Sequence, residues 1–277
     1  PTAFNGATLT GFVNGESEED LGGSLTIARC NPAENGVGEF IAVLRGSGFT
    51  SDNYEITYVD GDFSILPADA LLVKLESAKT TYAEDPVYTI SSAGYFSSTN
   101  EQLVDLISFA TISGISVRVL DSFESSSFTL EVLNPQSSTS GTLKAGSYTI
   151  GFKDEQLSSN VTSLKVLGTL EVTPSALQAR LAAGDSKEYD GIRDMVGVSV
   201  EPSGVLTDDV VTLSFGSALY SGASAGSQNY RVDGITLNGA DAANYTIDAQ
   251  LTGQGQISAK ALTVTGTTVT KVKAYDG

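Results

Sequence analysis

The sequence has no histidine and no tryptophan, and it has one cysteine, Cys30, and one methionine, Met195, among 277 residues. Without histidine, Ser-His-Asp and Cys-His catalysis lack their base. A single cysteine cannot form an intrachain disulfide, and it cannot assemble a cysteine–histidine zinc site. Carboxylate pairs are present, but no pair stands out for glycoside hydrolysis. We therefore expect a protein that is not an enzyme and has no cofactor.

Basic residues are also scarce. Lysine and arginine number 15 against 33 aspartates and glutamates, which gives a formal net charge of -18. Nucleic acid and anionic lipid surfaces both require basic side chains that replace counterions, so neither is an expected partner. No apolar run reaches the ~18 residues of a membrane-spanning helix, which argues against membrane insertion within this segment.

An internal repeat is the strongest positive signal. Four landmarks recur in the same order, and the interval from the fourth landmark to the next first landmark is 17, 17 and 18 residues. The first is an aromatic turn, found at Phe4-Asn5-Gly6, Tyr82, Tyr189-Asp190-Gly191 and Tyr275. The second is a glycine before an aromatic strand, assigned to Gly38, Gly146 with Tyr148, and the stretch Asn229–Val232. The third begins at Asn53-Tyr54, Asn160-Val161 and Asn244-Tyr245, and the fourth contains Ile65, Val172 and Ile257.

These landmarks predict three tandem domains that begin and end out of phase with the chain. Residues 1–67 form a first repeat without its N-terminal strand, 68–174 a second repeat with an insertion near 91–141, and 175–260 a third. Residues 261–277 then supply the first strand and turn of a following repeat. Because Pro1 is not methionine and no signal segment follows it, we interpret the chain as a processed protein or a piece of a longer one.

Each repeat reads as β-structure. In "NYEITYVDGDFSIL", Tyr54, Ile56 and Tyr58 alternate with polar residues, and Asp60-Gly61 suits a type I′ turn, so this stretch predicts a hairpin. Helical spacing occurs only in "STNEQLVDLISF", where a short helix and a strand are equally expected. The predicted fold is all-β, with three sandwich-like domains of immunoglobulin-like or β-grasp-like topology in an extended array.

The landmarks resemble two repeat-domain families. The third repeat, with "KEYDG", "DDVVTL", "GITLNGADAANYTI" and "ISAKALTVTG", is similar to YDG domains. The first two, with "NYEITYVDGDFSILPADALLV" and "TTYAEDPVYTI", resemble MBG domains. Both families occur as tandem arrays in bacterial surface and secreted proteins. The resemblance implies a structural segment of an extracellular adhesin or surface filament, located outside the cell or at the bacterial surface, with no catalytic residues to carry over.

The candidate residues follow from this repeat. Its structural positions are Phe4, Gly6, Tyr54, Asp60, Gly61, Tyr82, Tyr148, Tyr189, Asp190, Gly191, Tyr245 and Tyr275. The tail "ALTVTGTTVTKVKAY" alternates as a strand, and Leu262, Val264, Val269 and Val272 are its candidate contacts with another subunit. We expect this strand to complete the first repeat of a neighbour head to tail, unless the array continues covalently into further repeats.

Two other interpretations are weighed against these. A carbohydrate- or matrix-binding module would use the insertion of the second repeat to contact surface glycans. The acidic loop with Glu16, Glu18, Glu19 and Asp20 offers carboxylates for Ca²⁺, but it lacks the alternating spacing of a calcium loop, so a solvated loop is favoured.

Overall fold

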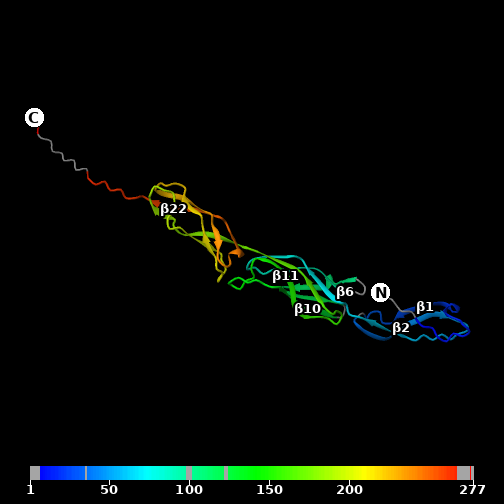
Figure 1. Cartoon of the computed structure of the whole chain (residues 1–277). Coiled ribbons are helices and arrows are strands. Elements are labelled where there is room, and N and C mark those ends of the chain that lie inside the picture. Colours follow the sequence, from blue (N-terminus) through cyan, green and yellow to red (C-terminus); the bar gives the residue numbers. More distant parts are fainter. Residues whose placement is uncertain (1–6, 35, 98–101, 122–123, 267–274, 276–277) are drawn as a thin grey trace. The chain divides into compact units, whose positions relative to one another are not determined.

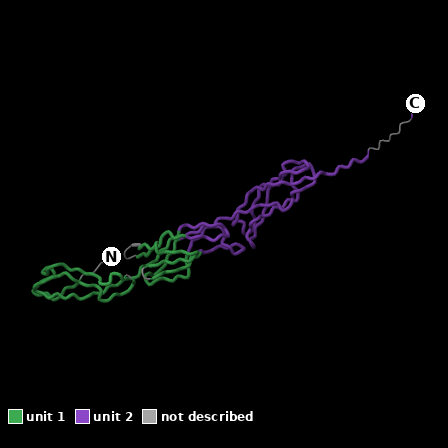
Figure 2. The backbone as a smooth tube through the Cα atoms, turned by 180° about the vertical axis from the view of Figure 1, so that it is seen from behind, with its two compact units in different colours: residues 1–75, 89–131, 151–167 green, residues 76–88, 132–150, 168–277 purple. Residues whose placement is uncertain are grey.

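The computed structural model describes residues 7–34, 36–97, 102–121, 124–266 and 275 (Figure 1). The all-β prediction is confirmed, because the described residues contain β-strands and only short 3-10 helices. The chain divides into two compact units, each built from separate stretches (Figure 2). Unit 1 contains residues 1–75, 89–131 and 151–167, and unit 2 contains residues 76–88, 132–150 and 168–277. The three domain boundaries drawn from the repeat stay predictions.

Unit 1 begins with an antiparallel sheet in the order β1-β2-β3. These strands are β1 (Gly22–Arg29), β2 (Gly38–Thr50) and β3 (Gly61–Ile65), preceded by the 3-10 helix η1 (Glu18–Asp20). The predicted hairpin is wrong here, because β3 pairs with β2 and residues 53–60 form no strand. Since no hairpin has to close, Asp60 and Gly61 both lack the positive φ of a type I′ turn.

The rest of unit 1 comes from the second predicted repeat. One sheet has the order β12-β4-β6-β7. Its strands are β4 (Ala70–Leu75), β6 (Ile90–Ser97), β7 (Gln102–Asp105) and β12 (Leu164–Leu167). A meander joins β8 (Ala110–Ser113), β9 (Ser116–Leu120) and β10 (Ser125–Val132). The insertion therefore folds mainly as strands, with η2 (Ile107–Phe109) as a single short 3-10 helix in its described part.

Unit 2 begins with β5, β13 and β11, in which β13 pairs parallel to β5 and antiparallel to β11. Their bounds are β5 (Ala78–Thr81), β13 (Thr169–Thr173) and β11 (Gly146–Gln156), the last having residues in both units.

The third repeat contains two larger sheets, in the orders β16-β14-β21 and β15-β22-β19-β18, and the pair β17-β20. Their bounds are β14 (Ser175–Ala183), β15 (Ser186–Glu188), β16 (Ser199–Ser203), β17 (Thr212–Ser214), β18 (Ser217–Tyr220), β19 (Gly226–Asp233), β20 (Thr236–Asn238), β21 (Tyr245–Ile247) and β22 (Gln250–Ser258). A short 3-10 helix, η3 (Ala242–Asn244), precedes β21.

The strand registers align the three repeats independently of residue type. Ile65 lies opposite Gly38, Val172 opposite Gly146, and Ile257 opposite Gly226. The second landmark of the third repeat therefore begins at Gly226, and its assignment to Asn229–Val232 was wrong. The landmark was searched for by its aromatic residue, and the search missed this position because Gln228 replaces the aromatic residue that Phe40 and Tyr148 provide in the other copies.

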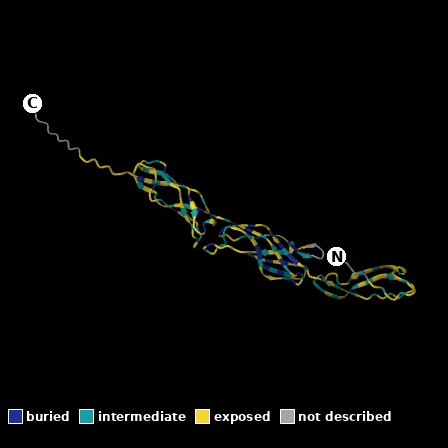
Figure 3. Cartoon of the chain, in the orientation of Figure 1, coloured by how far each residue is buried: buried dark blue, intermediate teal, exposed yellow. Residues whose placement is uncertain are grey.

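Burial differs sharply between the repeats. The second repeat buries many apolar side chains, among them Leu71, Val73 and Val119, each at most 1% exposed. In residues 7–66, Val43 is the only buried residue among those described, and Figure 3 shows mostly intermediate and exposed colours there. The first repeat is thus open where the others are packed.

Candidate functional site

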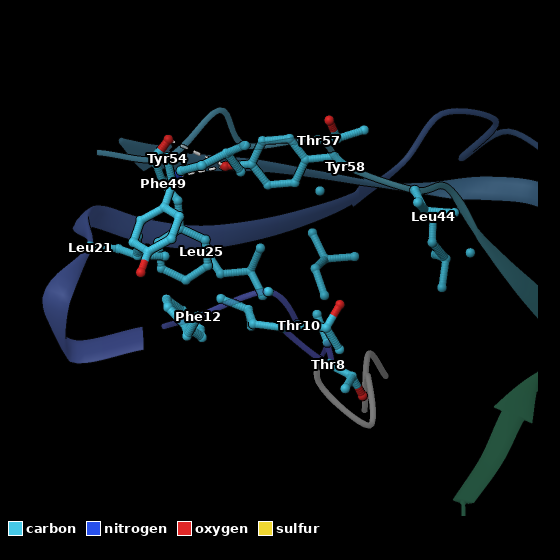
Figure 4. Close-up of a pocket in the computed structure, with 18 of the residues that line it drawn as sticks. Thr8, Thr10, Phe12, Leu21, Leu25, Leu44, Phe49, Tyr54, Thr57 and Tyr58 are labelled. Atoms are coloured by element: carbon cyan, nitrogen blue, oxygen red, sulfur yellow. Dashed lines mark hydrogen bonds between the residues drawn. The ribbon is translucent and has the colours of Figure 1, made fainter. Parts of the chain in front are cut away.

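A groove of about 730 Å³ lies in the first repeat, where its missing core would be. Its floor is the sheet β1-β2-β3, and its walls are residues 7–12 and 54–59, neither of which forms a strand. Figure 4 shows side chains from both walls and from the floor directed toward the same space. The apolar residues that line it include Leu9, Phe12, Leu21, Leu25, Ile27, Leu44, Phe49, Ile56 and Phe63.

The two walls are linked at one end of the groove by Tyr54. Its ring packs edge-on against Phe12 at a centroid distance of 5.6 Å, and its hydroxyl accepts a hydrogen bond from the Val13 N–H (3.3 Å). The hydroxyl also donates to the Glu16 carboxylate, and this bond raises the pKa of Tyr54. The walls therefore stay close to each other without a strand between them.

The other repeats have a strand at the place that corresponds to this groove. In the second, β4 lies between parallel β12 and antiparallel β6. In the third, β14 lies between parallel β21 and antiparallel β16. The wall 54–59 follows its asparagine landmark as β12 and β21 follow theirs. Within residues 7–34 and 36–66, no strand takes the place of β4 or β14.

A second feature, in unit 2, is a carboxylate cluster that joins the second and third repeats. Asp209 Oδ2 accepts hydrogen bonds from the hydroxyls of Tyr82 and Tyr245, each at 2.6 Å. Its other oxygen accepts the Ser140 N–H at 3.2 Å. The Tyr82 hydroxyl also lies 2.7 Å from Ser138 Oγ, and the two tyrosine rings pack edge to face.

Two further residues of the third repeat bind backbone N–H groups of the second. Asp241 is 1% exposed, and it accepts from the N–H groups of Thr139 (3.1 Å) and Val210 (2.9 Å). Asn244, also 1% exposed, accepts from the Ala145 N–H through Oδ1 at 3.0 Å. These buried acceptors thus satisfy donors on loop 139–145.

The electrostatics of this cluster favour ionised carboxylates. Burial acts to raise the pKa of Asp209, but hydrogen bonds from Tyr245, Tyr82 and Ser140 outweigh it and lower the pKa to about 2. Hydrogen bonds from Thr139 and Val210 lower the pKa of Asp241. Burial, followed by the bond to Asp209, raises the pKa of Tyr245. Both carboxylates are therefore ionised at neutral pH.

Unit 1 contains a corresponding junction between the first and second repeats. Asn160 Oδ1 accepts from the Val37 N–H at 3.1 Å, and its Nδ2 donates to Asp121 at 2.6 Å. The Asn160 carbonyl accepts from the Ala68 N–H at 2.8 Å. Asp121 also accepts from the Tyr95 hydroxyl at 2.7 Å. The asparagine that begins the third landmark thus serves both junctions.

The YDG turn itself is organised by a buried lysine. The Lys187 ammonium, with its side chain 4% exposed, donates to Asp190 Oδ1 (2.8 Å) and to the carbonyls of Ile192 and Asp194. The bond from Lys187 lowers the pKa of Asp190. Gly191 has φ of 83°, a conformation that favours glycine. Tyr189 is 42% exposed, whereas Tyr82 is 2% exposed.

The remaining predicted positions lie apart from these features. The Tyr148 hydroxyl donates to the Lys144 carbonyl, and Asp60 lies 3.5 Å from Arg45. Leu262, Val264 and Tyr275 are 90%, 86% and 96% exposed. Phe4, Gly6, Val269 and Val272 lie outside the described residues.

One acidic residue of the predicted acidic loop, Asp20, caps a short helix. Ser17 and Asp20 form the capping box of η1. In the described part of the chain, no group of three or more metal-binding side chains is arranged to hold an ion. No helix in that part has the length and apolar character needed to span a membrane.

Sequence reasoning missed three key residues of the junctions, namely Asn160, Asn244 and Asp209. Both asparagines begin the third landmark, and this recurrence was the available signal for them. For Asp209 there was none, since Tyr82 lies 127 positions away in the sequence.

Comparison with known proteins identifies two domain types. Residues 173–253 match the YDG domain, and residues 1–64 match the MBG domain (YGX type). No curated protein matches significantly, and no solved structure does. The two matches confirm the resemblance for the first and third repeats. Two stretches of the chain are thus similar to an MBG domain and a YDG domain, in that order, and this combination indicates a segment of a repeat-type surface protein.

Proposed function

We propose that this chain is a structural segment of an extracellular adhesin or filament at a bacterial surface, where it provides reach and stiffness. In this proposal the first repeat of one copy is completed by residues 261–277 of a neighbouring copy, head to tail. The supporting observation is the open groove of the first repeat, which lies where the other repeats hold β4 and β14.

The energetics favour filling the groove with a strand. Leu262 and Val264 are almost fully exposed, and burying each side chain is worth about 1.5–3 kcal/mol. Backbone hydrogen bonds to both walls add about 0.5–1.5 kcal/mol each. A strand that enters another molecule's sheet in this way is a known mode of association, and a heterologous contact of this kind need not close into a ring.

Deletion of residues 261–277 tests the proposal. Sedimentation should show concentration-dependent oligomers for the full chain and monomers for the deletion variant. Adding a peptide that spans residues 259–274 to the variant should fill its groove and quench or shift tyrosine fluorescence. In a longer polypeptide a preceding repeat would supply the strand covalently, and the mass of native material on a denaturing gel distinguishes this case.

A matched pair of variants separates strand insertion from nonspecific association. Leu262→Asp with Val264→Asp places charges on the face expected to enter the groove and should abolish assembly. Thr263→Asp with Thr265→Asp adds the same charge to the opposite face and should leave assembly intact. Oligomers that persist after the deletion, or a full chain that stays monomeric at all concentrations, would contradict the proposal.

A further inference from the structure

The two junctions within the chain follow one plan. In each, an asparagine Oδ1 of the later repeat accepts the N–H of the residue before the glycine that begins β2 or β11. Asn160 accepts from Val37, and Asn244 accepts from Ala145. In each, the residue after the asparagine also pairs in parallel with the residue that follows a proline between the repeats.

This second contact is equally regular. Val161 pairs with Ala68, and Tyr245 pairs with Ser175. Ala68 and Ser175 both lie three positions after the fourth landmark, at Ile65 and Val172. Lys260 lies three positions after Ile257, the fourth landmark of the third repeat. Because both junctions have the same register, that register predicts how the two ends of the chain would pair.

The chain contains the two halves of a third such junction, the asparagine side in the first repeat and the N–H donor side in the third. Neither half is occupied within the part of the chain that the structure describes. Asn53 is exposed and precedes Tyr54, as Asn244 precedes Tyr245. Ala225 is exposed and precedes Gly226, as Ala145 precedes Gly146. The backbone confirms the second correspondence, because Gly226 and Gly146 occupy the same register position opposite the fourth landmark.

Tyr189 belongs to the same unoccupied half as Ala225, in the third repeat. Its N–H donates to the Ser258 carbonyl (2.9 Å), as the Tyr82 N–H donates to the Thr173 carbonyl (2.8 Å). The two tyrosines thus occupy equivalent backbone positions. Tyr82 is covered by Asp209 and Tyr245, whereas Tyr189 is 42% exposed.

The first repeat presents the counterpart of Asp209 at Glu16. Tyr54 accepts from the Val13 N–H and donates to Glu16, as Tyr245 accepts from the Leu206 N–H and donates to Asp209. The intervening turns match as well. Gly11 and Gly204 have φ of 103° and 98°, and Gly15 and Asp208 have φ of 84° and 72°. Glu16 and Asp209 are therefore equivalent acceptors.

We propose that a second copy of this chain docks through this unfilled junction. Asn53 accepts the Ala225 N–H of the other copy, Glu16 accepts its Tyr189 hydroxyl, and Tyr54 pairs with its Lys260. The inference rests on the proposed function, because the strand that enters the groove is the same. It adds the residues that select the partner and fix the register of that strand.

The register follows from β14 and β16. Gln178 pairs with Ser203, and Arg180 pairs with Glu201. The same alignment places Thr263 opposite Thr10 and Thr265 opposite Thr8 in the other copy. Thr8 and Thr10 line the groove in Figure 4, and all four equivalent residues of the third repeat are exposed. Cysteines at these positions are therefore accessible without disturbing the apolar face.

Disulfide trapping in the full chain tests the register. In a Cys30→Ser background, Thr263→Cys combined with Thr10→Cys should form a ladder of multimers on a nonreducing gel, as should Thr265→Cys with Thr8→Cys. The shifted pair Thr263→Cys with Thr8→Cys should cross-link at least about tenfold less, because disulfides require closely opposed Cβ atoms. Ladders from shifted pairs alone would overturn the inference while leaving strand insertion standing.

Single substitutions test the proposed docking contacts of Asn53, Glu16 and Tyr189. Asn53→Ala and Tyr189→Phe should each weaken assembly by about tenfold, the factor that corresponds to one lost hydrogen bond of about 1.4 kcal/mol. Asp52→Ala, at the exposed neighbour of Asn53, should change it less than twofold. In a double-mutant cycle, Glu16→Gln and Tyr189→Phe should not be additive. Suppose that Asn53→Ala and Tyr189→Phe leave assembly unchanged while the deletion of residues 261–277 abolishes it. The proposed docking contacts are then refuted and the proposed function is not.

Discussion

Neutralising Asp209 should weaken the junction between the second and third repeats. The substitution Asp209→Asn replaces a carboxylate that accepts from Tyr82, Tyr245 and Ser140 by an amide with one acceptor oxygen. The pKa of Asp209 falls from 3.8 to about 2, and each unit corresponds to about 1.36 kcal/mol. Because the side chain is partly exposed, solvent screening reduces this contribution, and we expect a loss of about 1–2 kcal/mol in the free energy of unfolding.

The pH dependence gives the same prediction a second readout. Since the pKa of Asp209 is lower in the folded state than in the unfolded chain, its stabilisation is complete above about pH 4 and disappears as the pH falls toward 2. Urea unfolding from pH 7 to pH 2.5 should therefore show a steeper acid loss for the parent chain than for Asp209→Asn. The deletion variant lacking residues 261–277 serves as the background, because assembly would otherwise add to stability.

Asp208→Asn is the matched control for this experiment. Asp208 is exposed and has φ of 72°, a conformation that asparagine tolerates well. This variant removes the same charge one position away and should change stability by less than about 0.5 kcal/mol. Equal stabilities of Asp209→Asn and the parent at pH 7, with equal acid profiles, would refute the reasoning.

Two further substitutions probe buried polar groups in the same background. Lys187→Met leaves Asp190 and two carbonyls without their buried partner and should cost about 3 kcal/mol, whereas Lys260→Met, at an exposed pair, should cost under about 0.5 kcal/mol in thermal unfolding. Tyr82→Phe removes a donor to Asp209 and should cost about 1–2 kcal/mol, whereas Tyr189→Phe should cost under about 0.5 kcal/mol in the monomer. Equal losses for the two members of either pair would contradict the assigned burial.

The periodicity of the sequence located the landmarks correctly where strand pairing or backbone conformation requires a particular residue. The fourth landmark lies opposite the second in every copy, and Gly191 adopts the positive φ that the YDG turn requires. The prediction failed at Asn229–Val232, because the aromatic residue used to find the landmark is replaced by Gln228. It also failed at residues 54–60, which alternate but form no strand, because alternation does not specify a partner strand.

The candidate sites were less predictable than the fold. Residues that form the junctions are far apart in the sequence, so neither charge nor spacing links Asp209 to Tyr82 or Asn244 to Ala145. A carboxylate near a strand and an asparagine before a tyrosine both have ordinary local explanations. Only their positions in the folded unit show that they accept hydrogen bonds from another repeat.

The sequence by itself determined the β-class, the repeated module and the acidic surface, because strand alternation, turn residues and net charge are local or additive properties. The tertiary structure alone decided which repeat has an open groove and which tyrosine is covered. Both depend on which strands pair and which side chains are removed from water, and these are contacts between residues distant in the chain. Identical residues at equivalent positions of the repeat, such as Tyr82 and Tyr189, therefore have different environments.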